Sequence, residues 1–134
     1  MLFRSAPELR PLIGNRIYGC DDCQLVCPWN KYAQRSTLSD FDAREPLGQA
    51  SLLELWGWGE EEFLRRSEGS AIRRIGWARW RRNLAVALGN ALRESADRDG
   101  TIRRSLGEAR DAAEPMVLEH IEWALAQAPD PGLV

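Results

Sequence analysis

All three cysteines of the chain lie in one stretch, Cys20-Asp-Asp-Cys-Gln-Leu-Val-Cys-Pro-Trp-Asn30. Cys20, Cys23 and Cys27 have the spacing C-x2-C-x3-C, and Pro28 follows the last of them. The same spacing occurs in the last three ligands of the bacterial run C-x2-C-x2-C-x3-C-P, which binds [4Fe-4S] clusters. The opening cysteine of that run would fall at position 17, which is Ile17. The sequence therefore predicts that the three thiols are cluster ligands.

The three thiols are too few to complete a cluster. In proteins with two clusters, the cysteine before the proline ligates the other cluster. On that rule Cys20 and Cys23 supply two of the four ligands of one cluster, and Cys27 supplies one ligand of a second cluster. Two [4Fe-4S] clusters need about eight thiolates. We therefore expect the other ligands to come from a missing N-terminal portion or from a separate chain, so that this chain looks like the tail of a longer iron-sulfur protein.

Other roles for the cysteines fit the sequence less well but stay open. A structural zinc site needs four ligands, and the only other soft donor, His120, lies far along the chain. A disulfide framework would use an even number of cysteines and wider spacings. The thiols could also be free and buried as small hydrophobic groups. His120 itself falls on the edge of an apolar helix face, where we expect it to pack or cap rather than to catalyse.

The composition predicts a globular protein of the cytoplasm. Apolar residues make up 44% of the chain and charged residues 28%, which is ordinary for soluble domains. The sequence contains no apolar run of the length that a transmembrane helix requires, and its start lacks the pattern of a signal peptide. We expect no membrane partner. We identify no catalytic residue in the chain.

The basic residues are concentrated in one part of the chain. The net charge is −2, but residues 65 to 82 carry seven arginines against Glu68 alone, which gives this stretch +6. Such a cluster can bind the phosphates of a nucleic acid, or it can be a solvated face that pairs with the acidic stretch before it. Arg79 and Arg82 are expected to project from the face of their helix that is opposite Trp77 and Trp80. The predicted RNA-binding residues are Arg65, Arg66, Arg73, Arg74, Arg79, Arg81 and Arg82.

The elements that must position these residues are predicted to be helices. Pro7 can begin a short helix that ends at Gly14, and Ser51 with Glu54 has the spacing of a capping box. Apolar residues recur at helical spacing from Trp77 onward, and no period-two pattern competes. Further helices are expected over 60–64, 77–91, 102–113 and 115–128. Stacked antiparallel helices with short joins are the pattern of an α-solenoid.

Two segments of the chain carry a resemblance to a known family. The stretch from Ile13 to Ala33, which includes the cysteines, resembles the second cluster segment of epoxyqueuosine reductase. The stretch from Glu68 to Asn90, with Arg-Arg-Ile-Gly-Trp-Ala-Arg-Trp-Arg-Arg-Asn at its centre, resembles the C-terminal HEAT-like helical domain of the same family. The segments occur in the family's order and at about its separation, and the resemblance weakens after Asn90.

The resemblance implies a fold and an activity. The expected fold is mostly α, with an iron-sulfur, ferredoxin-like segment at residues 1–34, a linker at 35–50, a HEAT-like α-solenoid of antiparallel helices at 51–128 and a frayed tail at 129–134. The family uses cobalamin and two [4Fe-4S] clusters to reduce epoxyqueuosine to queuosine in the anticodon loop of tRNA.

The chain departs from the family because the cobalamin-binding region has no counterpart in it. We therefore expect this chain alone to be inactive as an oxidoreductase, with cobalamin bound elsewhere in the complete protein. The alternative is a stand-alone α-helical module that binds RNA or protein and whose cysteines are vestigial.

Overall fold

The structure is a computed structural model that describes residues 5–42, 47–94, 97 and 99–128. The predicted tail at 129–134 and part of the predicted linker lie outside these residues. The described residues are mostly helical and contain no strand, which confirms the mostly α prediction. Within them, every helix is too short or too polar to cross a lipid bilayer.

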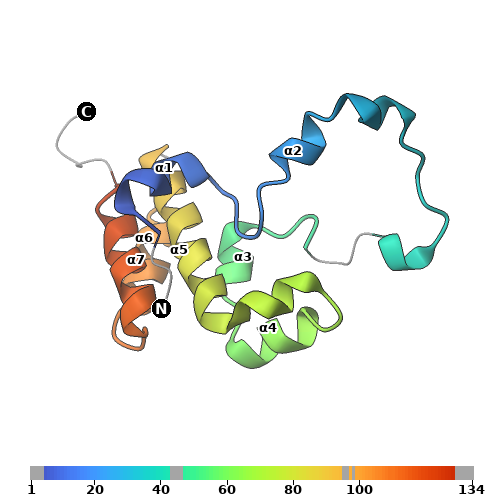
Figure 1. Cartoon of the computed structure of the whole chain (residues 1–134). Helices are drawn as coiled ribbons and strands as arrows, with labels where there is room; N and C mark the ends of the chain where they lie inside the picture. Colours follow the sequence, from blue (N-terminus) through green and yellow to red (C-terminus); the bar gives the residue numbers. More distant parts are fainter. Residues whose placement is uncertain (1–4, 43–46, 95–96, 98, 129–134) are drawn as a thin grey trace.

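The chain forms α-helices and 3₁₀-helices, with longer connections before and after the segment that holds α2 (Figure 1). In chain order they are η1 (Pro7–Leu9), α1 (Arg10–Ile13), α2 (Asp22–Leu25), η2 (Pro28–Tyr32), η3 (Ser39–Phe41), α3 (Leu52–Trp56), α4 (Glu60–Arg66), η4 (Ala71–Ile75), α5 (Gly76–Arg93), α6 (Thr101–Glu108) and α7 (Pro115–Leu125). We call α3 to α7 the helical body.

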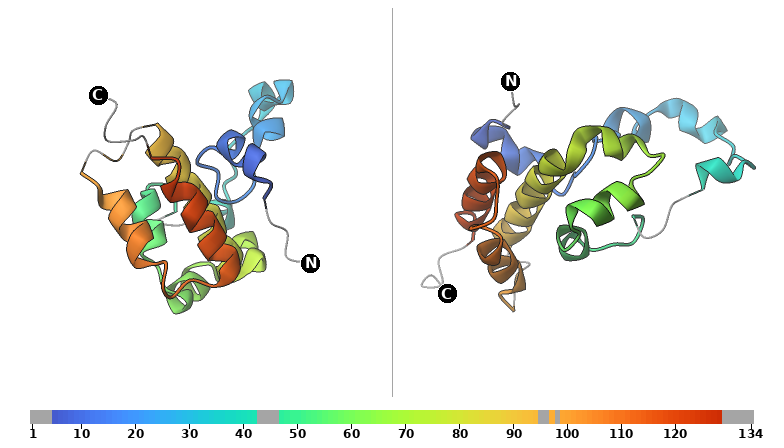
Figure 2. Two further views of the ribbon diagram at one scale, coloured as in Figure 1. Left: turned by 90° about the vertical axis from the view of Figure 1, so that its left-hand side faces the viewer. Right: turned by 90° about the horizontal axis from the view of Figure 1, so that it is seen from below.

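The long helix α5 lies at the centre of the helical body, with α7 along one side and α3 and α4 near its start (Figures 1 and 2). Its face at helical spacing, predicted from the sequence, is buried: Trp80, Leu84 and Leu88 are at most 2% exposed. These side chains share one core with Leu106 of α6 and Ile121 of α7. The helices α5, α6 and α7 run in alternating directions (Figure 2). Burial of this apolar face stabilises the helices far more than their local propensities do.

A glycine lets α5 and α7 approach closely. A Cβ atom at Gly89 would lie 2.7 Å from Cα of Ala124 and 2.7 Å from Cζ3 of Trp123. Atoms in ordinary van der Waals contact are at least 3.4 Å apart, so no larger side chain fits without moving α7. The position is therefore set by packing, although glycine weakens a helix interior.

The predicted start of α3 is confirmed in detail. The hydroxyl of Ser51 accepts a hydrogen bond from the amide of Glu54 at 3.2 Å, and the amide of Ser51 donates to the carboxylate of Glu54 at 2.7 Å. This is a complete capping box. It also lowers the pKa of Glu54, first through the bond from the Ser51 backbone.

The predicted helix over 102–113 is too long. The helix α6 ends at Glu108, and Ala109 and Ala113 lie in the connection to α7. Both alanines still pack against the core, so their spacing arises because they are partly buried and not because they belong to a helix. The connection ends at Pro115, which begins α7 as predicted.

Candidate cluster segment and nucleic-acid interface

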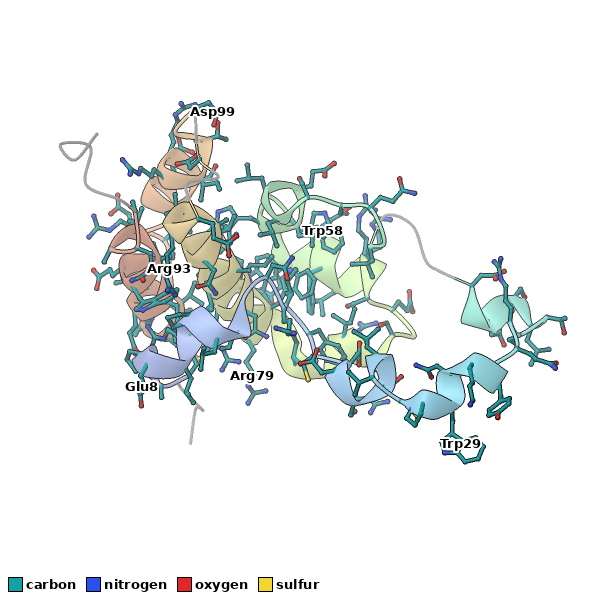
Figure 3. The ribbon with its side chains drawn as sticks, turned by 90° about the horizontal axis from the view of Figure 1, so that it is seen from above. Glu8, Trp29, Trp58, Arg79, Arg93 and Asp99 are labelled. Atoms are coloured by element: carbon teal, nitrogen blue, oxygen red, sulfur yellow. The ribbon has the colours of Figure 1, made fainter. Side chains whose placement is uncertain are left out.

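The cysteines lie on a segment that leaves the helical body. Residues 5–19, which we call the arm, run along α5 and α7, and the chain then passes outward through α2 and η2 (Figure 1). Figure 3 shows the labelled Trp29 at the outer side of this excursion, away from α5. We call residues 20–32 the cysteine segment. All its side chains are exposed except Cys27, which is half-buried.

The cysteine segment is a tight turn held by local hydrogen bonds. Asp21 has the left-handed φ of 54°, and its carbonyl accepts from the amides of Gln24 and Leu25, both at 2.9 Å. The Nδ2 of Asn30 donates to the carbonyl of Gln24 at 2.5 Å. Arg16 of the arm contacts the turn, because its Nη2 donates to both carboxylate oxygens of Asp22, at 2.9 and 3.2 Å. Asp21 makes no capping bond with its side chain, so Asp21 shapes α2 through its backbone.

The thiols are accessible to ligands. Cys20, Cys23 and Cys27 are free, Cys20 and Cys23 are exposed, and none is buried, so the interpretation as buried structural cysteines is wrong. Among the residues that the structure describes, no three of the types His, Cys, Asp and Glu are grouped closely enough to hold a metal ion. The donors suit thiolate ligation of iron, but they do not converge on one point as a single shell.

Large apolar side chains of the cysteine segment are exposed. Trp29 is 72% exposed and Tyr32 is 63% exposed, with their ring centroids 5.5 Å apart. Leu25 and Val26 of the same segment are exposed to a similar extent. These aromatic side chains are therefore not buried against the helical body.

The arm is fixed by a buried polar network that the sequence did not indicate. Arg10 is 1% exposed, and its guanidinium donates to Glu119 at 2.7 Å and to the carbonyl of Ser5 at 3.0 Å. The hydroxyl of Ser5 lies 2.9 Å from Nε2 of His120, whose Nδ1 lies 2.7 Å from the carbonyl of Met116.

Burial lowers the pKa of His120 below its ordinary value. We therefore assign the neutral imidazole, with Nδ1 donating to the carbonyl of Met116 and Nε2 accepting from Ser5. The predicted packing role of His120 is confirmed, since its side chain is fully buried and holds the arm.

The predicted RNA-binding arginines do not form one face. Arg65 and Arg66 both pair with Glu62 on the same helix, Arg65 at 2.6 Å. Arg66 also lies over the ring of Trp58, 5.1 Å from its centroid. These pairs lower the pKa of Glu62 and satisfy part of the positive charge locally.

Arg81 is turned inward. Its guanidinium lies 3.4 Å from the centroid of Trp56 and donates to the carbonyl of Trp56 at 2.5 Å. Burial lowers the pKa of Arg81 to about 10, so the side chain stays charged at neutral pH. This geometry ties the end of α3 to α5 and leaves Arg81 poorly placed for a nucleic acid.

Arg82 is half-buried and donates from Nε and Nη2 to Oδ1 of Asn83 at 3.0 and 2.7 Å. Burial lowers its pKa first, and the nearby charges of Arg79 and Arg10 lower it further. The sequence predicts that Arg82 projects from the face of its helix opposite Trp77 and Trp80, and its side chain is half-buried rather than fully exposed.

Arg73, Arg74 and Arg79 remain exposed. In Figure 3, Arg79 projects from the start of α5 between α1 and the cysteine segment. Its Nη1 donates to the carbonyl of Ile75 at 3.3 Å. Within the described ranges, none of the three forms an ion pair with a carboxylate. They are the members of the predicted set with positive charge available to a ligand.

The curated proteins to which this chain is similar include several epoxyqueuosine reductases. The chain is 59% identical over 123 residues to the epoxyqueuosine reductase of Alicycliphilus denitrificans. The matched region is 90% of this chain and 34% of the relative. It is also 59% identical over 120 residues to the epoxyqueuosine reductase of Escherichia coli. Here the matched region is 90% of this chain and 30% of the relative. The epoxyqueuosine reductase of Burkholderia pseudomallei is 56% identical over 135 residues, or 95% of this chain and 33% of the relative.

No family model and no solved structure matches. The chain spans about a third of the length of the curated relatives that it matches. The resemblance drawn from the cysteine and arginine stretches is confirmed: over about nine-tenths of its length, this chain is similar to a C-terminal portion of epoxyqueuosine reductases.

Proposed function

We propose that this chain acts as the C-terminal part of an epoxyqueuosine reductase, the oxidoreductase that reduces epoxyqueuosine to queuosine in the anticodon loop of tRNA. The observation that carries the proposal is the identity of 59% over 123 residues to a protein of that name. The chain's own contribution is a set of cluster ligands and a surface for tRNA. It supplies no catalytic residue, and cobalamin binds to the rest of the enzyme.

In this proposal Cys20 and Cys23 ligate one [4Fe-4S] cluster and Cys27 ligates the other. The clusters supply electrons for the reduction when they are bound. The exposure of the free thiols supports the assignment. The turn from Asp21 to Asn30 spaces the thiols, and the bond between Arg16 and Asp22 connects that turn to the arm.

The exposed apolar side chains support a partner polypeptide over the cysteine segment. Of the nine exposed large hydrophobic residues in the described part of the chain, eight lie between Leu9 and Leu38. Four of the eight lie in the cysteine segment, three in the arm and one beyond the segment, and an exposed apolar surface of this kind is typical of an interface. We propose that the portion of the enzyme that carries the remaining cluster ligands covers this surface. Together they form the ferredoxin-type unit to which residues 1–34 belong.

The finer division of the chain is part of the same proposal. Residues 51–128 form a HEAT-like domain, and the alternating directions of α5, α6 and α7 support a solenoid (Figure 2). Residues 35–50 link this domain to the cysteine segment. The arm belongs to the cluster segment in sequence but packs on the helical body in space.

For tRNA we propose contacts from Arg73, Arg74 and Arg79. These three side chains are exposed, and Arg79 lies on the side of α5 that faces the arm and the cysteine segment (Figure 3). Phosphate contacts by arginine are charge-assisted and depend steeply on salt. Arg65 and Arg66 are paired with Glu62, Arg81 is turned toward Trp56 and Arg82 is half-buried, so we do not include these four in the proposed contact set.

The function is tested with a chimera in which this chain replaces the matched portion of the Escherichia coli enzyme. The chimera is expressed in a strain that lacks its own reductase, and queuosine is measured in hydrolysed tRNA by mass spectrometry. We expect queuosine to be restored by the chimera and lost when Cys23 is replaced by Ser. A matched control, Ser39→Ala in the exposed η3, should retain it. Equal queuosine with all three cysteines replaced would overturn the proposed ligand role.

A further inference from the structure

We propose that Asn83 and Asn90 of α5 are positioning residues that hold the arm, and with it the cysteine segment, at a fixed place on the helical body. The inference rests on the proposed function, because the segment so positioned is the one that carries the cluster ligands. It assigns to α5 a role beyond its place in the core.

Both asparagines donate to backbone carbonyls of the arm. The Nδ2 of Asn83 donates to the carbonyl of Ile17 at 2.6 Å. The Nδ2 of Asn90 donates to the carbonyls of Arg10 at 2.9 Å and Gly14 at 2.8 Å. Positions 83 and 90 are two helical turns apart, so both side chains lie on the same face of α5. Arg10 begins α1 and Gly14 follows its last residue, so Asn90 contacts the arm at both ends of this short helix.

The carboxamide of Asn83 has a defined orientation. Its Oδ1 accepts two hydrogen bonds from Arg82, which leaves Nδ2 as the group that reaches the arm. Arg82 is itself half-buried, and the charge of Arg10 in the arm is near enough to lower its pKa. A donor that is fixed before the arm docks costs less entropy to engage than a free surface side chain does. Arg82 thus holds the carboxamide of Asn83 in the orientation that donates to the carbonyl of Ile17.

This contact lies close to the ligands in sequence and in space. Ile17 comes three residues before Cys20, and Asn83 and Cys20 border the same groove. The neighbouring residue Arg16 contacts Asp22 inside the cysteine turn. A connected path therefore runs from α5 through Ile17 and Arg16 to the first turn of α2. Movement of the arm on α5 would carry Cys20 with it.

The substitution Asn83→Asp tests this path with little other change. The carboxylate keeps the acceptor that Arg82 uses, but it cannot donate to Ile17 and repels its carbonyl. Loss of one neutral hydrogen bond corresponds to a change of about 3- to 10-fold in a local equilibrium. Asn83→Ala removes the same donor without adding charge. Asn15→Asp makes the same chemical change at an exposed position of the arm and is the matched control.

The measurement is the distance between two spin labels in the purified chain. One label is placed on Cys20 after Cys23 and Cys27 are changed to Ser, and the other on a cysteine introduced at the exposed Arg93. We expect one narrow distance distribution in this background and in Asn15→Asp. In Asn83→Asp and Asn83→Ala, the undocked fraction should rise by about 3- to 10-fold and broaden the distribution.

Thermal unfolding establishes that the helical body stays folded in each variant. Identical distributions with and without the Asn83 donor would overturn the inference. The readout needs no cluster, so its outcome is independent of whether the cysteines bind iron. A chain whose arm is released in Asn83→Asp, but whose thiols never ligate a cluster, would refute the proposed function and leave this positioning role intact.

Discussion

Replacing Gly89 by alanine should destabilise the helical body, although alanine is the better helix former. The new Cβ would meet Cα of Ala124 and the ring of Trp123 at 2.7 Å each. Overpacking a filled core costs about 1–3 kcal/mol. The gain in helix propensity from glycine to alanine is about 1 kcal/mol. The nearest atoms include the backbone of α7, which yields less than a flexible side chain, so we take the upper part of that cost, about 2–3 kcal/mol, and expect a net loss of roughly 1–2 kcal/mol in the free energy of unfolding.

Gly107 of α6 provides the matched control, because nothing lies within 4 Å of a Cβ built there. Gly107→Ala should be neutral or stabilise by up to about 1 kcal/mol. Thermal unfolding followed by circular dichroism should give a Tm that is lower by roughly 5–15 °C for Gly89→Ala and not lower for Gly107→Ala. A Gly89→Ala chain as stable as the parent would refute the close crossing of α5 and α7.

Further predictions concern pH, salt and iron. His120 has a lowered pKa in the folded chain, so its contribution to stability is present above about pH 6.5 and is lost as the pH falls, because the unfolded chain takes up the proton first. Tm should therefore decrease on acidification from pH 7.5 to 5.5, and less so in His120→Gln. Arg79→Ala should weaken tRNA binding and flatten the slope of log K against log salt by up to about one unit, whereas Arg81→Ala should lower Tm and leave that slope unchanged. The chain alone, reconstituted anaerobically with iron and sulfide, should not retain a stoichiometric [4Fe-4S] cluster, and four irons per chain with a cluster absorption band would contradict the division of ligands.

The parts of the fold that depend on local patterns could be predicted from the sequence. The buried face of α5 follows from the spacing of Trp80, Leu84 and Leu88, and the start of α3 follows from Ser51 and Glu54. In each case the deciding interaction joins residues a few positions apart. Helical periodicity and capping chemistry are read directly from such short windows.

The parts that depend on distant contacts could not be predicted. The residues around Arg10 in the sequence are of mixed polarity and suggest an exposed side chain. Arg10 is nevertheless buried, because Glu119, more than a hundred residues later, is its charge partner. Arg81 belongs to a run of arginines that reads as a surface, yet the end of α3 covers it. Charge density along the sequence therefore overestimated the surface available to a nucleic acid.

The connection after α6 shows a third kind of error. Ala109 and Ala113 continue the apolar spacing of the helix, so periodicity alone extends it beyond Glu108. Apolar residues in a connection can keep that spacing because they cover the same core. The end of α6 could not be predicted because, over a few residues, a buried connection and a helix give the same spacing of apolar residues.

The most direct test of the account counts iron in the purified chimera with the front part of the Escherichia coli enzyme. The parent chimera, reconstituted anaerobically, should hold about eight irons and eight acid-labile sulfides. Cys20→Ser and Cys23→Ser should each lose the same cluster, and Cys27→Ser should lose the other, as two distinct changes in the electron paramagnetic resonance spectrum of the reduced protein. Loss of the same cluster in all three variants, or of neither, would contradict the assignment of these cysteines to two ligand shells.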